Sequence, residues 1–231
     1  MNMLKGSLFV FVQSYKRQML WFWAILVAIM LLAYIAIEVF QSNVRIILSI
    51  SIPIYIFTWI IGSKFLTNTF NYYLRFGMSR GRYMLILGLL FFLISLFNAM
   101  LSGLLHELFS VLVGDMLNNQ IIVIHPLYVF DSTLPFQFIV LTDFFILLLC
   151  IVSGLLTNYM FYRFGIAGGY SLTGIIVLAL IVAVPLEWYG ELYDWLLQTS
   201  LVMFCGGIAI ISVLLYSLLA MGVRKLSAVQ V

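Results

Sequence analysis

Six apolar segments follow one another along this chain, and each is long enough to cross a lipid bilayer as a helix. A bilayer core about 30 Å thick needs about 20 helical residues at a rise of about 1.5 Å each. Helices are the expected spanning structure, because backbone groups must be paired within lipid and the alternation typical of strands is missing. The predicted spans cover residues 19–40, 46–65, 84–105, 136–161, 168–186 and 201–220.

The composition of the chain supports a membrane protein. Hydrophobic residues make up 65% of its 231 residues and charged residues only 8%, which lies far outside the range of soluble globular domains. No stretch is polar enough for a large soluble domain. We therefore predict an all-α integral membrane protein whose residues 1–231 form a single transmembrane domain.

The basic residues lie almost entirely on one side of the predicted spans. Ten of the eleven fall in the terminal segments or in loops reached after an even number of crossings, and Arg45 is the exception. Because Lys and Arg in short loops stay on the cytoplasmic side during insertion, we expect both termini in the cytoplasm. The ten are Lys5, Lys16, Arg17, Lys64, Arg75, Arg80, Arg82, Arg163, Arg224 and Lys225.

Residues 1–17, ahead of the first span, are predicted to form a short interfacial helix. Leu4 and Tyr15 fall on one helical stripe, with Lys5 and Lys16 roughly opposite. Such a helix lies along the membrane surface with its apolar face in the headgroup region. The alternative is a frayed leader before the first span. A cleaved signal peptide is not predicted, because the apolar run is too short and no small-residue cleavage site follows it.

The loop over residues 64–83 (KFLTNTFNYYLRFGMSRGRY) is the best candidate for a contact surface, because it holds four basic residues and no acid. Gly77 can adopt the left-handed conformation that ends a helix, and the Ser79 hydroxyl can cap the next one. The pattern predicts a helix, a sharp turn and a new helix that enters the membrane. The alternative is that its arginines only fix the topology and touch lipid headgroups.

The stretch RFGMSRGRYM at residues 75–84 resembles the segment between the second and third spans of bacterial ABC-2 type transporter permeases. The resemblance implies six spans with both termini inside, an N-terminal interfacial helix and a cytoplasmic coupling helix in this loop. It implies two protein partners: a second permease subunit, in a homodimer or heterodimer, and a separate cytoplasmic ATPase subunit. That subunit would bind ATP and Mg²⁺, so no cofactor is expected in this chain. The residues expected to contact the ATPase subunit are Arg75, Phe76, Gly77, Met78, Ser79, Arg80 and Arg82.

A short reentrant or surface helical element between the last two spans is a further feature of this family, and residues 184–198 (VPLEWYGELYDWLLQ) resemble it. Acidic and aromatic side chains gather there on different faces, and aromatic rings with a polar tip favour the headgroup level. We expect an interfacial helix in an extracytoplasmic loop at residues 187–199. It would be either a gate at the exit of a translocation path or an anchor for the last two spans. The residues concerned are Glu187, Trp188, Glu191 and Trp195.

The longest predicted extracytoplasmic loop, residues 106–135, contains both histidines of the chain, His106 and His125. Neither shows a metal-ligand spacing with a cysteine or an acid. No metal site is therefore predicted, and both histidines are expected at the surface or the membrane interface.

Asp143 is an acidic residue that lies well inside a predicted span, about two turns into residues 136–161. An ionised carboxylate there needs a partner, a proton or water. One hypothesis is that Asp143 faces the bundle interior and lines a polar translocation path with Asn98 or Asn158. The alternative is that it reaches back to the headgroups.

Two further predictions concern small residues: two cysteines and a pair of glycines. Cys150 and Cys205 fall at different depths of their spans and are expected to stay unpaired. Gly165 and Gly169 have the spacing of close helix contact at the inner edge of the fifth span.

The sequence lacks the motifs of the main rival classes. No GxSxG or HExxH motif supports an intramembrane enzyme, and no GxxxxGK[ST] loop supports ATP hydrolysis by this chain. No nucleic-acid partner is expected. We therefore predict a lipid-embedded permease subunit, an exporter of a peptide, a lipid-like or a hydrophobic compound. Two alternatives stay open: the substrate-capture membrane subunit of an importer, and a structural or immunity membrane protein without transport.

Overall fold

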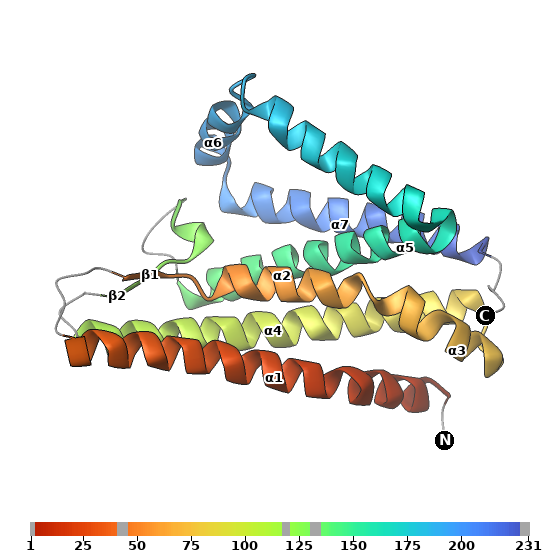
Figure 1. The fold of residues 1–231 in the computed structure, drawn as a ribbon, viewed down its shortest axis with the longest axis horizontal. Coiled ribbons are helices and arrows are strands. Elements are labelled where there is room, and N and C mark those ends of the chain that lie inside the picture. Colours follow the sequence, from red (N-terminus) through yellow and green to blue (C-terminus); the bar gives the residue numbers. More distant parts are fainter. Residues whose placement is uncertain (1–2, 41–45, 117–120, 130–134, 227–231) are drawn as a thin grey trace.

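The computed structural model describes residues 3–40, 46–116, 121–129 and 135–226, and most of them are helical (Figure 1). Helices α1, α4, α5 and α7 are long and apolar enough to cross a membrane, whereas α2 is a shorter apolar helix. The predicted helical architecture is confirmed at this level. The elements are α1 (Met3–Phe40), β1 (Ile46–Leu48), α2 (Ser51–Gly62), the π-helical turn η1 (Leu66–Phe70), α3 (Asn71–Arg75), α4 (Arg80–Met116), β2 (Ile121–Val123), the 3-10 turn η2 (Pro126–Val129), α5 (Phe136–Ala183), α6 (Trp188–Gln198) and α7 (Leu201–Arg224).

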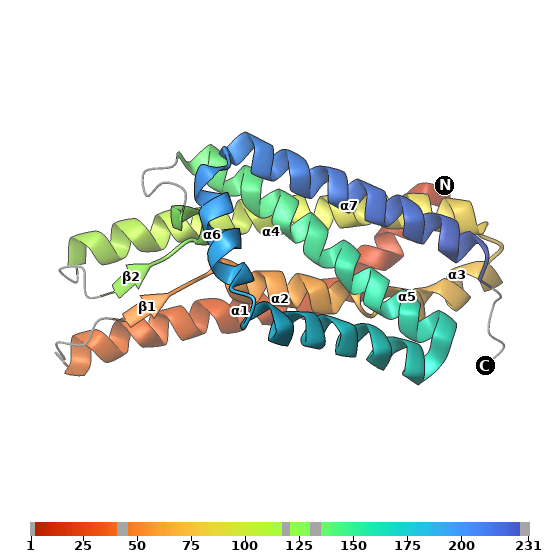
Figure 2. The same cartoon turned by 90° about the horizontal axis from the view of Figure 1, so that it is seen from above.

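The long helices run side by side along one axis (Figure 1). Helix α1 begins and α7 ends at the same end of this bundle, where α3 also lies; we call it the basic end. The opposite end carries β1 and β2 and is called the strand end. Seen from above, α6 lies across the bundle rather than along it (Figure 2).

Apolar side chains fill the interior of the bundle and also cover much of its outside. Phe65, Phe70 and Phe91 are buried between the helices near the basic end. On the outside, Ile166 of α5 is 73% exposed and Val202 of α7 is 75% exposed. Such a continuous apolar surface would be unfavourable in water, so it suits a protein surrounded by lipid.

Two glycines allow α2 and α5 to pack with their backbones in contact. A Cβ atom on Gly62 would lie 2.2 Å from the carbonyl oxygen of Ile151, and one on Gly154 would lie 2.2 Å from that of Trp59. No larger residue fits at either position without moving a helix. This close approach fixes the first part of α5 against α2, and Asp143 lies on that part of α5.

A glycine also divides α5 into two arms. Gly165 has φ 67° and ψ −160°, a backbone conformation that is essentially confined to glycine. The arms before and after it run in opposite directions along the bundle (Figure 1). They correspond to the predicted spans 136–161 and 168–186. Gly165 therefore makes the bend. A Cβ atom built on it would meet no atom within 4 Å, so within the described residues it forms no close helix contact of the kind expected for it with Gly169.

The start of the predicted second span, residues 46–65, is not helical. Its first residues form β1, which pairs in parallel with β2 and places Ile46 opposite Ile121. Helix α2 begins only at Ser51. Consecutive β-branched residues favour a strand, and the partner strand that completes the pairing lies more than seventy residues away in the chain.

Two helices are longer than predicted. Helix α1 runs unbroken from Met3, so no boundary separates the predicted interfacial segment from the first span. Helix α4 has 37 residues and continues to Met116, which makes it roughly 55 Å long at 1.5 Å per residue. The first part of the predicted outer loop 106–135 is therefore a helical extension beyond the length that a bilayer core needs.

Candidate functional site

The turn between α3 and α4 has the conformation that the sequence predicted. Helix α3 ends at Arg75, and Gly77 has a left-handed φ of 77°. The Ser79 hydroxyl accepts a hydrogen bond of 3.4 Å from the backbone N–H of Arg82, which caps the start of α4. Helix, sharp turn and new helix are thus confirmed.

The residues of this turn differ in their exposure to solvent. Phe76 is 65% exposed, and its ring lies 4.7 Å from that of Tyr72, which is also exposed. Arg80 is only partly exposed and donates from Nη1 to the carbonyl oxygen of Arg224, at 2.9 Å, so that it caps the end of α7. Of the remaining predicted contact residues, Arg75, Gly77, Ser79 and Arg82 are exposed and Met78 is buried.

Asn158 of α5 holds the segment that leads into this turn. Its Nδ2 donates to the Thr67 hydroxyl at 2.8 Å, and its Oδ1 accepts from the Thr67 backbone N–H at 3.1 Å. Thr67 lies in the π-helical turn η1. One turn further along α5, the Tyr162 hydroxyl donates to Asn71 Oδ1 at 2.9 Å. These bonds tie η1 and the start of α3, which lead into the turn, to α5.

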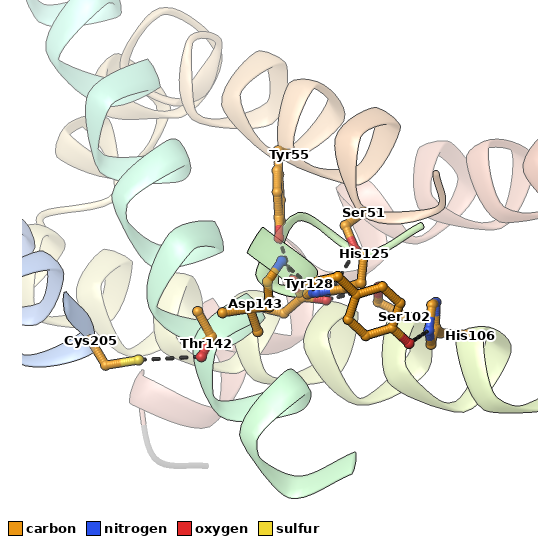
Figure 3. Close-up of polar contacts among 10 residues, drawn as sticks. Ser51, Tyr55, Ser102, His106, His125, Tyr128, Thr142, Asp143 and Cys205 are labelled. Carbon is orange, nitrogen blue, oxygen red and sulfur yellow. Dashed lines mark hydrogen bonds and ion pairs between the residues drawn. The ribbon is translucent and has the colours of Figure 1, made fainter. Parts of the chain in front are cut away.

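Asp143 is the centre of a buried polar cluster near the strand end (Figure 3). Its side chain is fully buried and accepts hydrogen bonds at both carboxylate oxygens. Ser102 of α4 donates to Oδ2 at 3.0 Å, and Ser51 of α2 donates to the same oxygen at 3.4 Å. Tyr55 of α2 donates to Oδ1. Asp143 thus faces the bundle interior and does not reach back to the headgroups.

His125 is the fourth hydrogen-bond partner of Asp143. Its Nε2 lies 3.0 Å from Asp143 Oδ1, and its Nδ1 accepts a hydrogen bond of 3.2 Å from the backbone N–H of Leu127. Because Nδ1 accepts, the ring proton is assigned to Nε2, which donates to the carboxylate. His125 is therefore a neutral imidazole held in one tautomer. In the described part of the chain, no Lys or Arg pairs with Asp143.

The second histidine lies beside the first. His106 Nε2 and the Tyr128 hydroxyl share a hydrogen bond of 2.7 Å, and the two imidazole rings are 5.6 Å apart. Burial and the negative charge of Glu107 raise the pKa of Tyr128. His106 and His125 are 3% and 1% exposed, so the prediction of surface histidines was wrong: the extension of α4 and strand β2 bring them inside. Among the described residues, no cluster of three or more His, Cys, Asp or Glu side chains could hold a metal ion.

The three residues of the predicted translocation path do not form one cluster. Asn98 is fully buried on α4, one turn from Ser102, and its Oδ1 accepts from Trp23 Nε1 at 3.1 Å. Asn158 lies 15 residues beyond Asp143 on α5, roughly 22 Å further along the helix. Asp143 and Asn98 thus belong to the strand half of the bundle, and Asn158 to the basic half.

Sequence reasoning missed Ser51, Tyr55 and Ser102, which supply three of the four donors to Asp143. A signal was present in α4, where polar residues recur three and four positions apart within an apolar segment. Such spacing places them on one helical face. They are Ser95, Asn98, Ser102 and His106.

The predicted outer element contains a helix, α6, and all of its predicted gate or anchor residues are exposed. Glu187, with a left-handed φ of 56°, makes the turn ahead of the helix. The Tyr189 hydroxyl donates to the carbonyl oxygen of Leu180 at 2.9 Å, which fastens α6 to the second arm of α5. An open polar cleft of about 470 Å³ is lined by Pro185, Leu186, Glu187, Gly190, Glu191 and Asp194.

Cys150 and Cys205 are both free thiols, as predicted. Cys205 of α7 is buried, and its sulfur lies 3.3 Å from the Thr142 hydroxyl of α5. This contact joins α7 to the helix that carries Asp143.

These features define a predominantly helical protein with four candidate membrane-spanning helices, an exposed basic turn at one end and a buried polar cluster toward the other. Comparison with protein-family models, curated proteins and solved structures gives no match to this chain. The proposed function therefore rests on the site and the sequence alone.

Proposed function

We propose that this chain is the permease subunit of an ATP-driven ABC-2 type transporter in a bacterial plasma membrane, and that it exports a peptide, a lipid-like or a hydrophobic compound. The proposal includes six membrane crossings, two of them by the arms of α5, with both termini in the cytoplasm. The observation that carries it is the exposed α3–α4 turn at the basic end.

The chemistry of this turn suits a protein partner. Exposed aromatic rings and arginines are the side chains most enriched at protein interfaces, and here Tyr72 and Phe76 stand beside Arg75. The turn is also firmly held, because Met78 is buried beneath it and the Ser79 hydroxyl caps α4. An ATPase subunit would thus meet a preformed surface rather than a flexible loop.

The connections of the turn offer a route for force. Helix α2 leads into it through η1 and α3, and α4 starts directly after it. Closure of a pair of ATPase subunits around ATP and Mg²⁺ would push on residues 76–82 and tilt α2 and α4 together. The path would then open between this subunit and a second permease subunit, identical or different, with α6 at its outer end.

Charge reversal at opposite ends of the bundle tests the proposal. The chain is tagged at its C-terminus, expressed from its native locus and purified in mild detergent, and its stoichiometric partners are identified by mass spectrometry. The test variant combines Phe76→Ala with Arg82→Glu, both exposed. The matched control is Glu191→Lys on α6, also exposed. Arg80 is left unchanged because it caps α7.

An ATPase that co-purifies with the wild-type chain and with Glu191→Lys, but is lost from the Phe76→Ala, Arg82→Glu variant, would support the coupling surface. Equal recovery with all three would reject this surface while keeping a transporter. Recovery of the wild-type chain with no nucleotide-binding partner would reject the permease proposal and favour the capture-subunit or structural alternatives.

A further inference from the structure

Polar residues form one stripe on α2 and another on α4, and both stripes reach Asp143. Ser51 of α2 and Ser102 of α4 bind the same oxygen of Asp143, which places them at one level. The two helices run in opposite directions (Figure 1). Thr58, seven residues after Ser51, and Ser95, seven residues before Ser102, therefore both lie about 10 Å deeper. Tyr55 and Asn98 lie between these levels, about one turn deeper than Ser51 and Ser102.

The deeper part of these stripes contains polar atoms that need partners. Thr58 Oγ1, Ser95 Oγ and Asn98 Nδ2 make no hydrogen bond within the described part of the chain, although all three side chains are fully buried. Buried polar groups in proteins are nearly always paired, and ordered water is the usual partner where protein groups do not reach. Water bound to these three atoms would form a narrow column below Asp143.

The cluster above this column can hold one proton. Oδ1 of Asp143 accepts a hydrogen bond from the Nε2–H of His125. Nε2 cannot become an acceptor while the Leu127 N–H bonds to Nδ1, because the ring proton must then stay on Nε2. Oδ2 faces two serine hydroxyls, and a hydroxyl can either donate or accept. A proton on Oδ2 would be donated to Ser51 or Ser102 with no heavy atom displaced. The network thus accommodates both the carboxylate and the carboxylic acid.

We propose that Asp143 is an intramembrane proton-binding site and that the column between α2 and α4 supplies it with water. A hydronium ion in the column gives its proton to Oδ2, which leaves a neutral carboxylic acid and a water molecule. No cation in the described residues offsets the ionised form, so protonation removes an uncompensated charge from the apolar bundle. This site is independent of the ATPase contact surface.

The titratable groups around Asp143 come from every packed element. Tyr55 of α2 and His125, just beyond β2, contact it directly. His106 of α4 and Tyr128 of η2 form the next pair toward the strand end, with the exposed Glu107 beyond them. Cys150 lies two turns further along α5, and Cys205 of α7 contacts the neighbouring Thr142. Among these titratable groups, Asp143 is the one buried carboxylate.

Infrared difference spectroscopy of the purified chain in lipid nanodiscs tests the proton site. As the pH of the medium is stepped, the wild type should show a carboxylic-acid C=O band that appears on acidification and shifts in D₂O. Asp143→Asn, which preserves the side-chain shape, should lose this band, and Glu107→Gln should keep it. A wild type without the band, or an unchanged band in Asp143→Asn, would overturn the proposal.

Two further variants keep the test decisive if Asp143→Asn does not fold. Ser102→Ala removes one hydrogen bond from Oδ2 and should shift the band frequency, whereas an unshifted band would reject Asp143 as its source. The column is tested by Thr58→Ala with Ser95→Ala, which should slow deuterium exchange of the band several-fold. Ser153→Ala is the control, because that hydroxyl bonds only to the Cys150 carbonyl in its own helix. Equal exchange rates would reject the column.

Discussion

His125 binds Asp143 through Nε2 and Oδ1 at 3.0 Å, and this contact connects the strand end to the helical bundle. The histidine follows β2, and the carboxylate belongs to α5. Both side chains are buried. The pair therefore joins the polar cluster of the bundle to the segment between β2 and η2.

His125→Ala should destabilise the fold. The change leaves the Leu127 N–H without its acceptor and removes one donor from Asp143, and an unsatisfied buried group costs about 1–3 kcal/mol. Denaturant titration in detergent, followed by circular dichroism, measures the loss. Glu107→Gln, an exposed change on the neighbouring helix, should leave the midpoint unchanged. Equal midpoints for His125→Ala and wild type would contradict the buried pair.

Gly165→Ala should destabilise the bend of α5, because its φ of 67° and ψ of −160° are accessible only to glycine without strain. The expected cost is about 1–3 kcal/mol. Gly174→Ala in the second arm is the matched control. It is helical and meets no atom within 4 Å, so it should be neutral or stabilise by about 0.4–1 kcal/mol. Thermal unfolding of both variants would reveal the contrast, and equal effects would argue against the bend.

The bonds between Asn158 and Thr67 should show measurable coupling. In a double-mutant cycle of Asn158→Ala and Thr67→Ala, we expect a coupling free energy near the membrane-protein average of about 0.6 kcal/mol, with an upper bound of about 1.7 kcal/mol. Unfolding in mixed micelles supplies the four stabilities. Because the Asn158 amide also binds the Thr67 backbone, Thr67→Ala alone should cost less than Asn158→Ala. A coupling of zero would show that α5 does not hold the turn through this pair.

Cysteine labelling should place the two ends of the bundle on opposite sides of the membrane. In a Cys150→Ala, Cys205→Ala background, Glu191→Cys should react with a membrane-impermeant maleimide on intact cells. Phe76→Cys should react only after the cells are permeabilised. Both positions are exposed in the structure, so a difference in labelling would report the side of the membrane. Labelling of both variants on intact cells, or the reverse pattern, would refute the proposed orientation.

Local signals in the sequence predicted local structure well. Apart from the start of the second segment, the apolar segments formed helices. Gly77 and Ser79 marked the end of α3 and the start of α4, because each of these effects acts within a few residues of its source. The residues around Asp143 were harder to predict. Ser51, Ser102 and His125 come from three separate segments, and only packing decides whether such side chains meet. The spacing of Ser95, Asn98, Ser102 and His106 marked a polar face of α4 but not what it faced.

The sequence by itself determined that the chain is helical and apolar, with basic residues gathered at one end. Burial of apolar side chains and internal pairing of the backbone follow from composition and segment length alone. Tertiary structure decided that residues 46–48 pair with residues 121–123, that α5 reverses at Gly165 and that both histidines are buried. These outcomes depend on contacts between distant segments. The free energy of a buried polar group depends on the partners that reach it, and only the packed helices bring those partners together.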